Sequence, residues 1–264
     1  MSLDPARART WHRLGIGPLW IERGTSEAAP NASSLPPETT SSEAARPEIQ
    51  ASTAVSPGIR NTDERVIAIS KLDWADLRTA VAACTQCALC KTRKQTVFGV
   101  GFQSAPWMLV GEAPGAEEDQ RGEPFVGQAG RLLDNMLAAA GLTRNGESER
   151  SVYIANVLKC RPPGNRNPEP AEVALCEPFL LRQVALVQPR VVVVMGRFAA
   201  QALLRTDATI ASLRGRVHGI EVAGRKVPIV VTYHPAYLLR NLADKAKSWA
   251  DLCLAREVYE RAAG

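Results

Sequence analysis

Four cysteines have a spacing that could hold a metal centre. Cys84 and Cys87 form a CxxC pair, and Cys160 and Cys176 form a second pair. Four thiolates can bind a zinc ion or an iron–sulfur cluster. A zinc ribbon usually repeats the CxxC spacing, which the second pair does not. The spacing therefore favours a 4Fe-4S cluster and leaves zinc open.

Two further cysteines are predicted to be buried thiols rather than ligands. Cys90 extends the first pair to CxxCxxC, but the fourth cysteine and the proline of the ferredoxin pattern are absent. Cys253 stands alone near the end of the chain. We expect both to pack as small hydrophobic side chains, as unligated cysteines usually do.

A carboxylate, an amide and an imidazole follow the ends of three predicted strands. Glu112 lies in GEAPG after a strand at 107–110. Asn156 ends a strand at 152–156, and His234 opens HPA after a strand at 227–232. Because ligands of open α/β sheets bind at the carboxyl ends of the strands, we expect these side chains to share one site.

The elements that must position these residues alternate between helix and strand. A continuous apolar run at 191–195, four β-branched valines followed by a methionine, indicates a fourth strand, buried on both faces. Helices are expected at 72–83, 130–140, 169–187, 196–204 and 245–262. Strands separated by helices predict an α/β fold, a three-layer α/β/α sandwich with a central four-stranded parallel sheet.

The first quarter of the chain differs from the rest in composition. Residues 24–63 are rich in Pro, Ser, Thr, Ala and Glu, and no aromatic residue occurs between Trp20 and Trp74. Such a segment buries too little apolar surface to fold. The sequence therefore predicts a short recognition segment at 1–23, a disordered linker at 24–65 and one catalytic domain at 66–264.

The charge is uneven along the 264 residues. The net charge is +5, with a balance of −1 over residues 1–65 and +6 over the remainder. A basic domain fits a polyanionic partner, although many proteins without one have a similar excess. No apolar run reaches the ~20 residues that span a bilayer, and the N-terminus lacks a secretory signal. We expect a cytoplasmic protein without a membrane segment.

From about Cys84 to Tyr259 the chain resembles the family 4 uracil-DNA glycosylases, the iron–sulfur branch of that superfamily. The matching segments are GEAPGAEED at 111–119, PFVGQAG at 124–130, YIANVLKCRPPGNRNP at 153–168 and YHPAYLLR at 233–240. The four cysteines match the family's cluster ligands in order and spacing. The resemblance implies a monomeric enzyme that flips uracil out of DNA and hydrolyses its N-glycosidic bond, initiating base excision repair.

The same resemblance gives each site residue an expected role. Glu112 would orient or activate water, although a carboxylate there could also cap the next helix. Phe125 would stack on the flipped base, and Asn156 would pair with the O4/N3 edge of uracil. His234 would donate a hydrogen bond to O2 of the leaving base. Glu118 would crowd C5 against the thymine methyl, and Gly111 and Gly115 complete the substrate-binding set.

The loop after Cys160 bears on turnover and on DNA contact. A related branch that stays attached to its product has a histidine where this chain has Asn165. An amide is not a useful nucleophile, so we expect turnover by water. Arg161, Arg166 and Arg240 are candidates for phosphate contacts, or else solvated surface side chains.

Residues 8–23 (ARTWHRLGIGPLWIER) resemble the N-terminal peptide by which the psi subunit of the bacterial clamp loader docks on its partner. An aromatic-aliphatic segment on a linker is how tethered recognition peptides are built. The alternative is that the segment packs on the enzyme's own core. For the whole protein, the alternatives are a non-catalytic nucleic-acid-binding module and a redox sensor built on the cluster.

Overall fold

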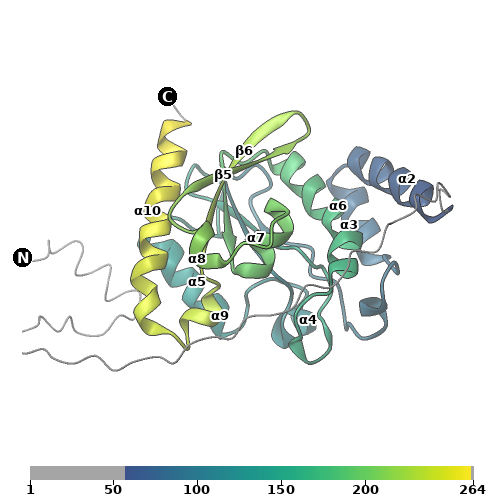
Figure 1. Ribbon diagram of the computed structural model, residues 1–264, viewed down its shortest axis with the longest axis horizontal. Coiled ribbons are helices and arrows are strands. Elements are labelled where there is room, and N and C mark those ends of the chain that lie inside the picture. Colours follow the sequence, from purple (N-terminus) through teal and green to yellow (C-terminus); the bar gives the residue numbers. More distant parts are fainter. Residues whose placement is uncertain (1–56, 263–264) are drawn as a thin grey trace, which may run out of the picture.

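A six-stranded sheet forms the centre of the computed structural model, which describes the backbone of residues 57–262 and the side chains of residues 63–262 (Figure 1). The strand order is β1-β3-β2-β4-β6-β5. The strands are β1 (Val100–Gly101), β2 (Trp107–Gly111), β3 (Val152–Asn156), β4 (Val191–Met195), β5 (Val217–Val222) and β6 (Arg225–Thr232). The four central strands are parallel, as predicted, and β1 and β5 add antiparallel edges.

The two edge strands escaped the sequence prediction for physical reasons. Strand β1 has only two residues, too few to show a period. Strand β5 alternates between exposed and half-buried side chains and ends in a tight turn at Ala223 and Gly224, which both have positive φ. Such a turn matches the twist of a two-stranded hairpin.

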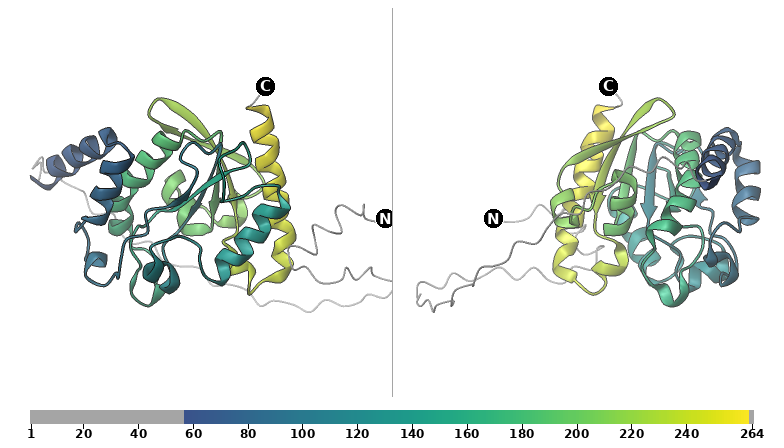
Figure 2. Two further views of the ribbon diagram at one scale, coloured as in Figure 1. Left: turned by 180° about the vertical axis from the view of Figure 1, so that it is seen from behind. Right: turned by 45° about the vertical axis from the view of Figure 1, so that its right-hand side comes forward.

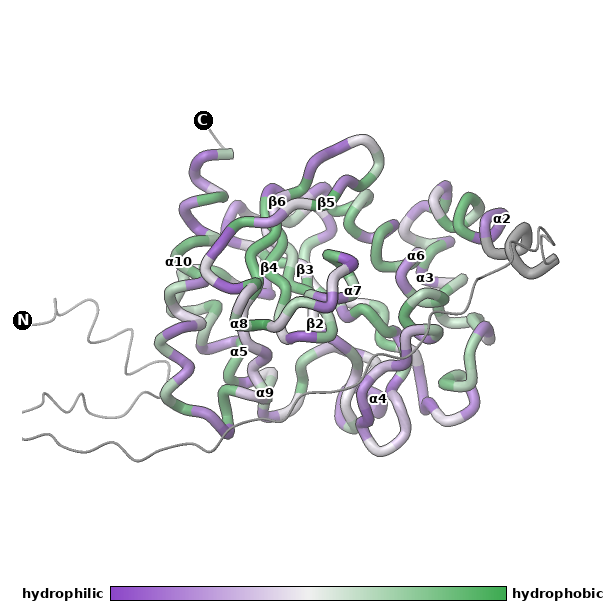
Figure 3. The backbone as a smooth tube through the Cα atoms, viewed as in Figure 1, coloured by the Kyte–Doolittle hydropathy of each residue, from purple (hydrophilic) through white to green (hydrophobic). Residues whose placement is uncertain are grey.

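Helices cover both faces of the sheet, so the predicted three layers are confirmed (Figure 2). One face packs on α5 (Gln128–Ala139) and α10 (Lys245–Arg261), and the other on α6 (Pro170–Val187) and α7 (Arg197–Leu204). Alternate side chains of a strand point to opposite faces of the sheet and so belong to different core clusters. Leu109 packs in the cluster on the α5 and α10 side, and Met108 in the cluster on the α6 and α7 side. The green strands at the centre of Figure 3 show how apolar this sheet is.

The described part of the chain begins earlier than the expected domain boundary at residue 66. Helix α2 (Pro57–Lys71) includes the last residues assigned to the 24–65 linker, and it packs on α6. Ile69 is buried there, because the helix turns one apolar side chain onto the domain. Helix α3 (Trp74–Ala82) then leads into Cys84. Residues 1–56, which contain the rest of the linker and the predicted recognition segment, lie outside the described residues.

Short helices build the loops at the carboxyl edge of the sheet. They are α4 (Ala116–Arg121), α8 (Ile210–Leu213), α9 (Pro235–Leu238) and the 3-10 turns η1 (Ala88–Lys91), η2 (Pro163–Asn165) and η3 (Leu242–Asp244). Each is too short to produce a clear hydrophobic period in the sequence. Among the residues described, no helix has the length and apolar character needed to cross a membrane.

Candidate active site and cysteine cavity

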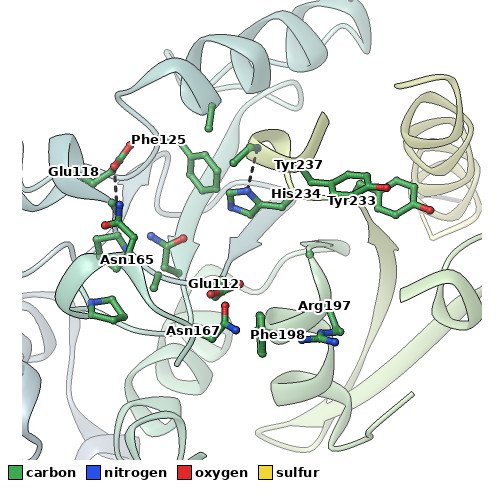
Figure 4. Close-up of a pocket in the computed structure, with 18 of the residues that line it drawn as sticks. Glu112, Glu118, Phe125, Asn165, Asn167, Arg197, Phe198, Tyr233, His234 and Tyr237 are labelled. Atoms are coloured by element: carbon green, nitrogen blue, oxygen red, sulfur yellow. Dashed lines mark hydrogen bonds between the residues drawn. The ribbon is translucent and has the colours of Figure 1, made fainter. Parts of the chain in front are cut away.

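A cavity of about 650 Å³ opens at the carboxyl ends of the parallel strands (Figure 4). Segments after all four strands line it: Glu112–Glu118 after β2, 156–167 after β3, Gly196–Phe198 after β4 and Tyr233–Arg240 after β6. The volume falls in the usual range for small-molecule sites. The predicted residues Glu112, Gly115, Glu118, Phe125, Asn156 and His234 all line this cavity.

Strand register brings the first two polar groups together. Gly111 pairs directly with Asn156 across β2 and β3, and Glu112 is the next residue. Gly111 itself lies behind the pocket wall, where an added Cβ would meet Phe125 Cζ at 2.7 Å and also clash with Asn156 Oδ1. Glycine is therefore required for Phe125 and Asn156 to approach this strand end.

Glu112 carries a carboxyl group with unusual acidity. Burial raises its pKa to about 7, and the positive charge of Arg197 partly opposes the shift. A group with a pKa near neutrality can both accept and release a proton. The capping alternative has no support, because α4 begins after Gly115 and no backbone N–H of the described residues donates to the carboxylate of Glu112.

His234 is held as a neutral imidazole with a defined tautomer. Its Nδ1 accepts a hydrogen bond from the backbone N–H of Ala236 at 3.2 Å, drawn as a dashed line in Figure 4. Burial lowers its pKa to about 4, with a smaller opposing effect from Glu118. Because Nδ1 is the acceptor, the ring proton resides on Nε2. The residue is thus a neutral hydrogen-bond donor.

Phe125 contributes to the core and to the pocket at once. It is 6% exposed, belongs to the cluster that includes Leu132 and Leu133, and stacks on the His234 ring with centroids 5.4 Å apart. Its φ of 56° is rare for an aromatic residue. The Phe125 carbonyl lies so close to Gly130 that no side chain fits there. The loop therefore holds one aromatic face at the cavity.

Glu118 fixes the loop that carries Phe125. Its Oε1 accepts from the backbone N–H groups of Val126 and Gly127 at 3.0 and 3.2 Å. Its Oε2 accepts from the N–H of Gly115 at 3.1 Å. A carboxylate that accepts three backbone hydrogen bonds is a strong organiser of local structure. The structure thus gives Glu118 a loop-holding role, while its expected contact with C5 of a base stays a prediction.

Asn156 offers an acceptor that the protein does not use. The residue is 2% exposed, and its Oδ1 is buried without a hydrogen-bond partner. Most buried polar atoms in native proteins are paired, because an unpaired one costs about 1–3 kcal/mol. An orphan oxygen at the wall of a cavity is explained by a ligand that donates to it.

The three predicted phosphate-contact arginines lie in different environments. Arg166 lines the pocket, but its guanidinium pairs with Glu169 and with the buried Glu172, which raises the pKa of Arg166. Arg161 donates through Nε to Asn165 Oδ1 at 2.7 Å and is not part of the pocket wall. Arg240 is exposed on the pocket lining.

Arg197 and Phe198 line the pocket and were missed by the sequence analysis. They follow the end of β4, and Arg197 lies 4.5 Å from the Phe198 ring centroid (Figure 4). The strand-end rule that found Glu112 and Asn156 would have found them too, since Gly196 directly follows the VVVVM strand.

A second cavity is lined by Cys84, Cys87, Cys160 and Cys176. Cys90 is half-buried beside Cys87 and lies outside this lining. Cys253 is exposed on α10, so the expectation that it is buried was wrong; the helix turns it away from the sheet. The structure thus groups the four predicted ligands and leaves out the other two cysteines.

The cysteine cavity contains hydrogen-bond donors suited to thiolates. Arg93 Nη1 donates to Cys160 Sγ at 3.0 Å, and the backbone N–H of Lys159 donates to Cys176 Sγ at 3.3 Å. Burial raises the pKa of the Cys176 thiol to about 12. No three acidic, histidine or cysteine side chains of the described residues converge closely enough for a single ion. Four thiols around one cavity match the number of ligands of both a zinc site and a 4Fe-4S cluster.

Comparison with known proteins agrees with this geometry. A profile of the uracil DNA glycosylase superfamily matches residues 98–253, so the chain belongs to that superfamily. It is 46% identical over 168 residues to the type-4 uracil-DNA glycosylase of Archaeoglobus fulgidus, a match that covers 62% of this chain and 82% of that protein. For the type-4 enzyme of Pyrobaculum aerophilum, identity is 38% over 187 residues, covering 69% and 93%. For that of Thermotoga maritima it is 41% over 168 residues, covering 63% and 83%.

Proposed function

We propose that the protein is a uracil-DNA glycosylase of the cytoplasm that hydrolyses the N-glycosidic bond of uracil in DNA. The product is an abasic site, the starting point of base excision repair. The observation that carries the proposal is the orphan Oδ1 of Asn156 beside the ring of Phe125, in a cavity that also holds Glu112 and His234. A flipped pyrimidine supplies both a flat face and an N–H donor.

Base selection follows from the amide of Asn156. Its Oδ1 accepts from N3–H of uracil, and its Nδ2 donates to O4. Cytosine has an unprotonated N3 and an amino group at these two positions, so it leaves both amide atoms unpaired. A site built to hydrogen-bond one base rejects such an analogue strongly. Phe125 stacks on the base and adds affinity without selectivity.

Bond cleavage uses Glu112 and His234 on opposite ends of the reacting bond. The C1′–N1 bond breaks with its electron pair on N1, which leaves uracil as an anion and the sugar oxocarbenium-like. Water adds its oxygen to C1′, and its proton passes to the carboxylate of Glu112. The Nε2–H of His234 donates to O2 of the leaving anion. One such preorganised donor contributes about 2.7–4 kcal/mol to transition-state stabilisation in other enzymes.

The loop at Asn165 supports turnover by water. Asn165 lines the pocket, and its Oδ1 accepts from Arg161. An amide held in this way has no lone pair basic enough to attack C1′. The enzyme therefore releases its DNA product rather than keeping it covalently bound.

The four cysteines of the second cavity would hold a 4Fe-4S cluster. Cys84 and Cys87 lie just before η1, Cys160 follows the Asn156 strand end, and Cys176 lies on α6. When bound, the cluster supplies a rigid cross-link among these three segments. Arg93 and the N–H of Lys159 would donate to its thiolate ligands.

DNA backbone contacts are assigned to the basic side chains at the pocket mouth. Arg240 is exposed and has no carboxylate partner among the ion pairs of the described residues. Arg161 is available through the part of its guanidinium not bound to Asn165. Arg166 is the weakest of the three, because Glu172 already offsets its charge. Phosphate contacts of this kind position the enzyme and carry no sequence information.

Residues 8–23 are assigned to docking on a clamp-loader subunit, with the enzyme itself acting as a monomer. The proposal stands on the sequence resemblance alone, since the segment lies outside the described residues. A pull-down with full-length protein should retain clamp-loader subunits, and Trp11→Ala with Trp20→Ala should abolish retention. Failure of the full-length protein to retain them would refute this assignment.

The test of the proposed function is base excision on oligonucleotides, run beside visible absorbance of the same anaerobic sample. Alkali should cleave a strand with one uracil at that position and should leave the thymine and cytosine strands intact. The sample should be brown. A brown, folded protein that leaves the uracil strand uncleaved would refute the function, and a colourless active protein would refute the cluster.

A further inference from the structure

Lys159 is a fully buried cation that lines the cysteine cavity and also contacts Asn156 of the active site. It is 1% exposed, three residues after Asn156 and directly before Cys160. Its Nζ donates to the backbone carbonyl of Asn156 at 2.8 Å and to Gln183 Oε1 at 2.6 Å. The ammonium group therefore touches the residue that we assign to base selection.

Gln183 is itself fixed, and so it fixes the direction of the lysine. It is completely buried on α6, and its Nε2 donates to the Phe98 carbonyl at 2.9 Å and to Tyr153 Oη at 3.2 Å. Because both hydrogens of the amide are used, Oε1 must face Lys159. The lysine thus spans from α6 to the end of β3 in one defined orientation.

The backbone around Lys159 ties the same loop to the catalytic strand end. The Lys159 carbonyl accepts from the N–H of Val97 at 2.8 Å. Val157 and Leu158 donate to the carbonyls of Gly111 and Glu112 at 2.9 and 3.0 Å. The loop therefore connects the Asn156 carbonyl, the Glu112 backbone and the cysteine cavity through hydrogen bonds.

A lysine at this position is not explained by packing. It forms no ion pair with Asp or Glu in the part of the chain that the structure describes. Its charge does lie near Cys176 and Cys160, whose thiolates would favour the ammonium form. Burying an ammonium group is still costly, and a methionine of similar shape would fill the same space without that cost. What methionine cannot supply are the two hydrogen bonds of the ammonium group, one to Gln183 Oε1 and one to the Asn156 carbonyl, and the second of these reaches the active site.

We propose that Lys159 is a positioning residue for base selection, which holds the end of β3 so that the Asn156 amide meets the pyrimidine edge. This inference rests on the proposed function. Lys159 touches neither the base nor the sugar. It acts through Asn156, whose Oδ1 has no partner within the protein to hold it in place.

The test is inhibition of excision by free uracil, which measures how well the pocket binds the base. Lys159→Met should raise the inhibition constant of uracil about tenfold, equivalent to about 1.4 kcal/mol. The KM for uracil DNA should rise together with the inhibition constant. The matched control is Lys226→Met, an exposed lysine on the β5–β6 hairpin, which should leave the constant unchanged.

A double-mutant cycle distinguishes positioning from a general structural role. In an Asn156→Ala background, Lys159→Met should have less than about a twofold further effect, because the residue through which it acts is gone. The same fold-change in both backgrounds would overturn the proposal. So would a wild-type inhibition constant in Lys159→Met.

Cluster content gives a second readout. The N–H that Lys159 donates to Cys176 is a backbone group, so Lys159→Met should keep the brown absorbance per mole of protein. Loss of the colour with unchanged uracil inhibition would mean that the lysine serves the cluster, against the proposal. If Lys159→Met does not fold, Gln183→Leu is measured in its place in the same double-mutant cycle. Gln183→Leu should also raise the inhibition constant of uracil. A wild-type enzyme that neither excises uracil nor binds it would refute the function itself.

Discussion

The imidazole of His234 lies against the ring of Phe125, with centroids 5.4 Å apart and ring planes 30° apart. This contact joins the PFVG loop to the HPA segment across the pocket. It places the aromatic face assigned to stacking beside the N–H donor assigned to the leaving base. One ring therefore orients the other, and both face the same cavity (Figure 4).

Glu112→Gln should reduce uracil excision at least about 100-fold, because general-base catalysis contributes about that much and the amide cannot take a proton. Binding of uracil DNA should persist, since the shape of the side chain is kept. Single-turnover excision and a DNA-binding assay measure the two effects. The control is Glu117→Gln, an exposed residue of α4 that pairs with Arg121, and it should behave as wild type. Wild-type turnover by Glu112→Gln would remove Glu112 from the mechanism.

Excision should depend on pH through the ionisation of Glu112. Burial holds its pKa at about 7, so the active carboxylate form is lost as the pH falls through that value. The rate should drop about tenfold per pH unit below 7 and level off above it. His234 stays neutral down to about pH 4 and adds no second change in this range. A rate constant that does not change between pH 5 and 8 would contradict this assignment.

The pH dependence of folding stability gives an independent check of the raised pKa of Glu112. The folded pKa of Glu112 lies above its ordinary value of 4.5, so the folded state binds the proton more tightly. Wild type should therefore lose stability relative to Glu112→Gln as the pH rises from about 4.5 to 7. After allowance for partial exposure, the difference above pH 7 is on the order of 1 kcal/mol. Denaturant midpoints at pH 5 and pH 8 measure it.

Much of the fold could be predicted because the pattern is local. The run Val191–Met195 is four β-branched valines followed by a methionine, and it is a strand buried on both faces. The edge strand Val217–Val222 alternates only between exposed and half-buried residues, so its pattern is weak. The first part of helix Pro57–Lys71, up to residue 65, was assigned to the linker because the composition of that segment is polar.

The site was predictable in its residue types and not in its contacts. Glu112, Asn156 and His234 follow strand ends, which the sequence reveals. The bonds from Val126 and Gly127 to Glu118 depend on how the PFVG loop folds back on α4, and the pairing of Lys159 with Gln183 joins the segment after β3 to α6. The sequence contains no local signal for such contacts, so only the folded chain shows them.

Asn156→Asp should weaken uracil selection about 100-fold. An ionised carboxylate only accepts hydrogen bonds and cannot donate to O4 of uracil. The carboxylate would also be buried, because the residue is 2% exposed. The ratio of rates for uracil and cytosine strands measures the effect. Asn145→Asp, on an exposed loop, is the control and should keep the wild-type ratio. Unchanged excision by Asn156→Asp would refute the recognition role.

Replacement by alanine of Cys84, Cys87, Cys160 or Cys176 should remove the brown chromophore and much of the soluble yield, since each lines the second cavity. Cys90→Ala and Cys253→Ala should keep both. Iron content per mole of protein, with visible absorbance, is the measurement. Loss of iron in Cys90→Ala with Cys160→Ala unaffected would overturn the ligand set.

Deletion of residues 1–56 should leave excision on short oligonucleotides nearly unchanged, because every described contact of the domain is kept. Deletion of residues 1–71 also removes α2 and the buried Ile69, and it should lower the thermal midpoint by several degrees. Melting curves and excision rates of the two truncations measure the difference. Equal melting temperatures would show that α2 adds nothing to the domain.

The central claim is most directly tested by intact-mass spectra of DNA and protein after reaction of wild-type enzyme with a single-uracil oligonucleotide. The account predicts a strand in which a hydroxyl has replaced uracil, together with free uracil and a protein of unchanged mass. A DNA strand of unchanged mass would contradict the glycosylase function. A covalent adduct of DNA and protein would contradict turnover by water at Glu112.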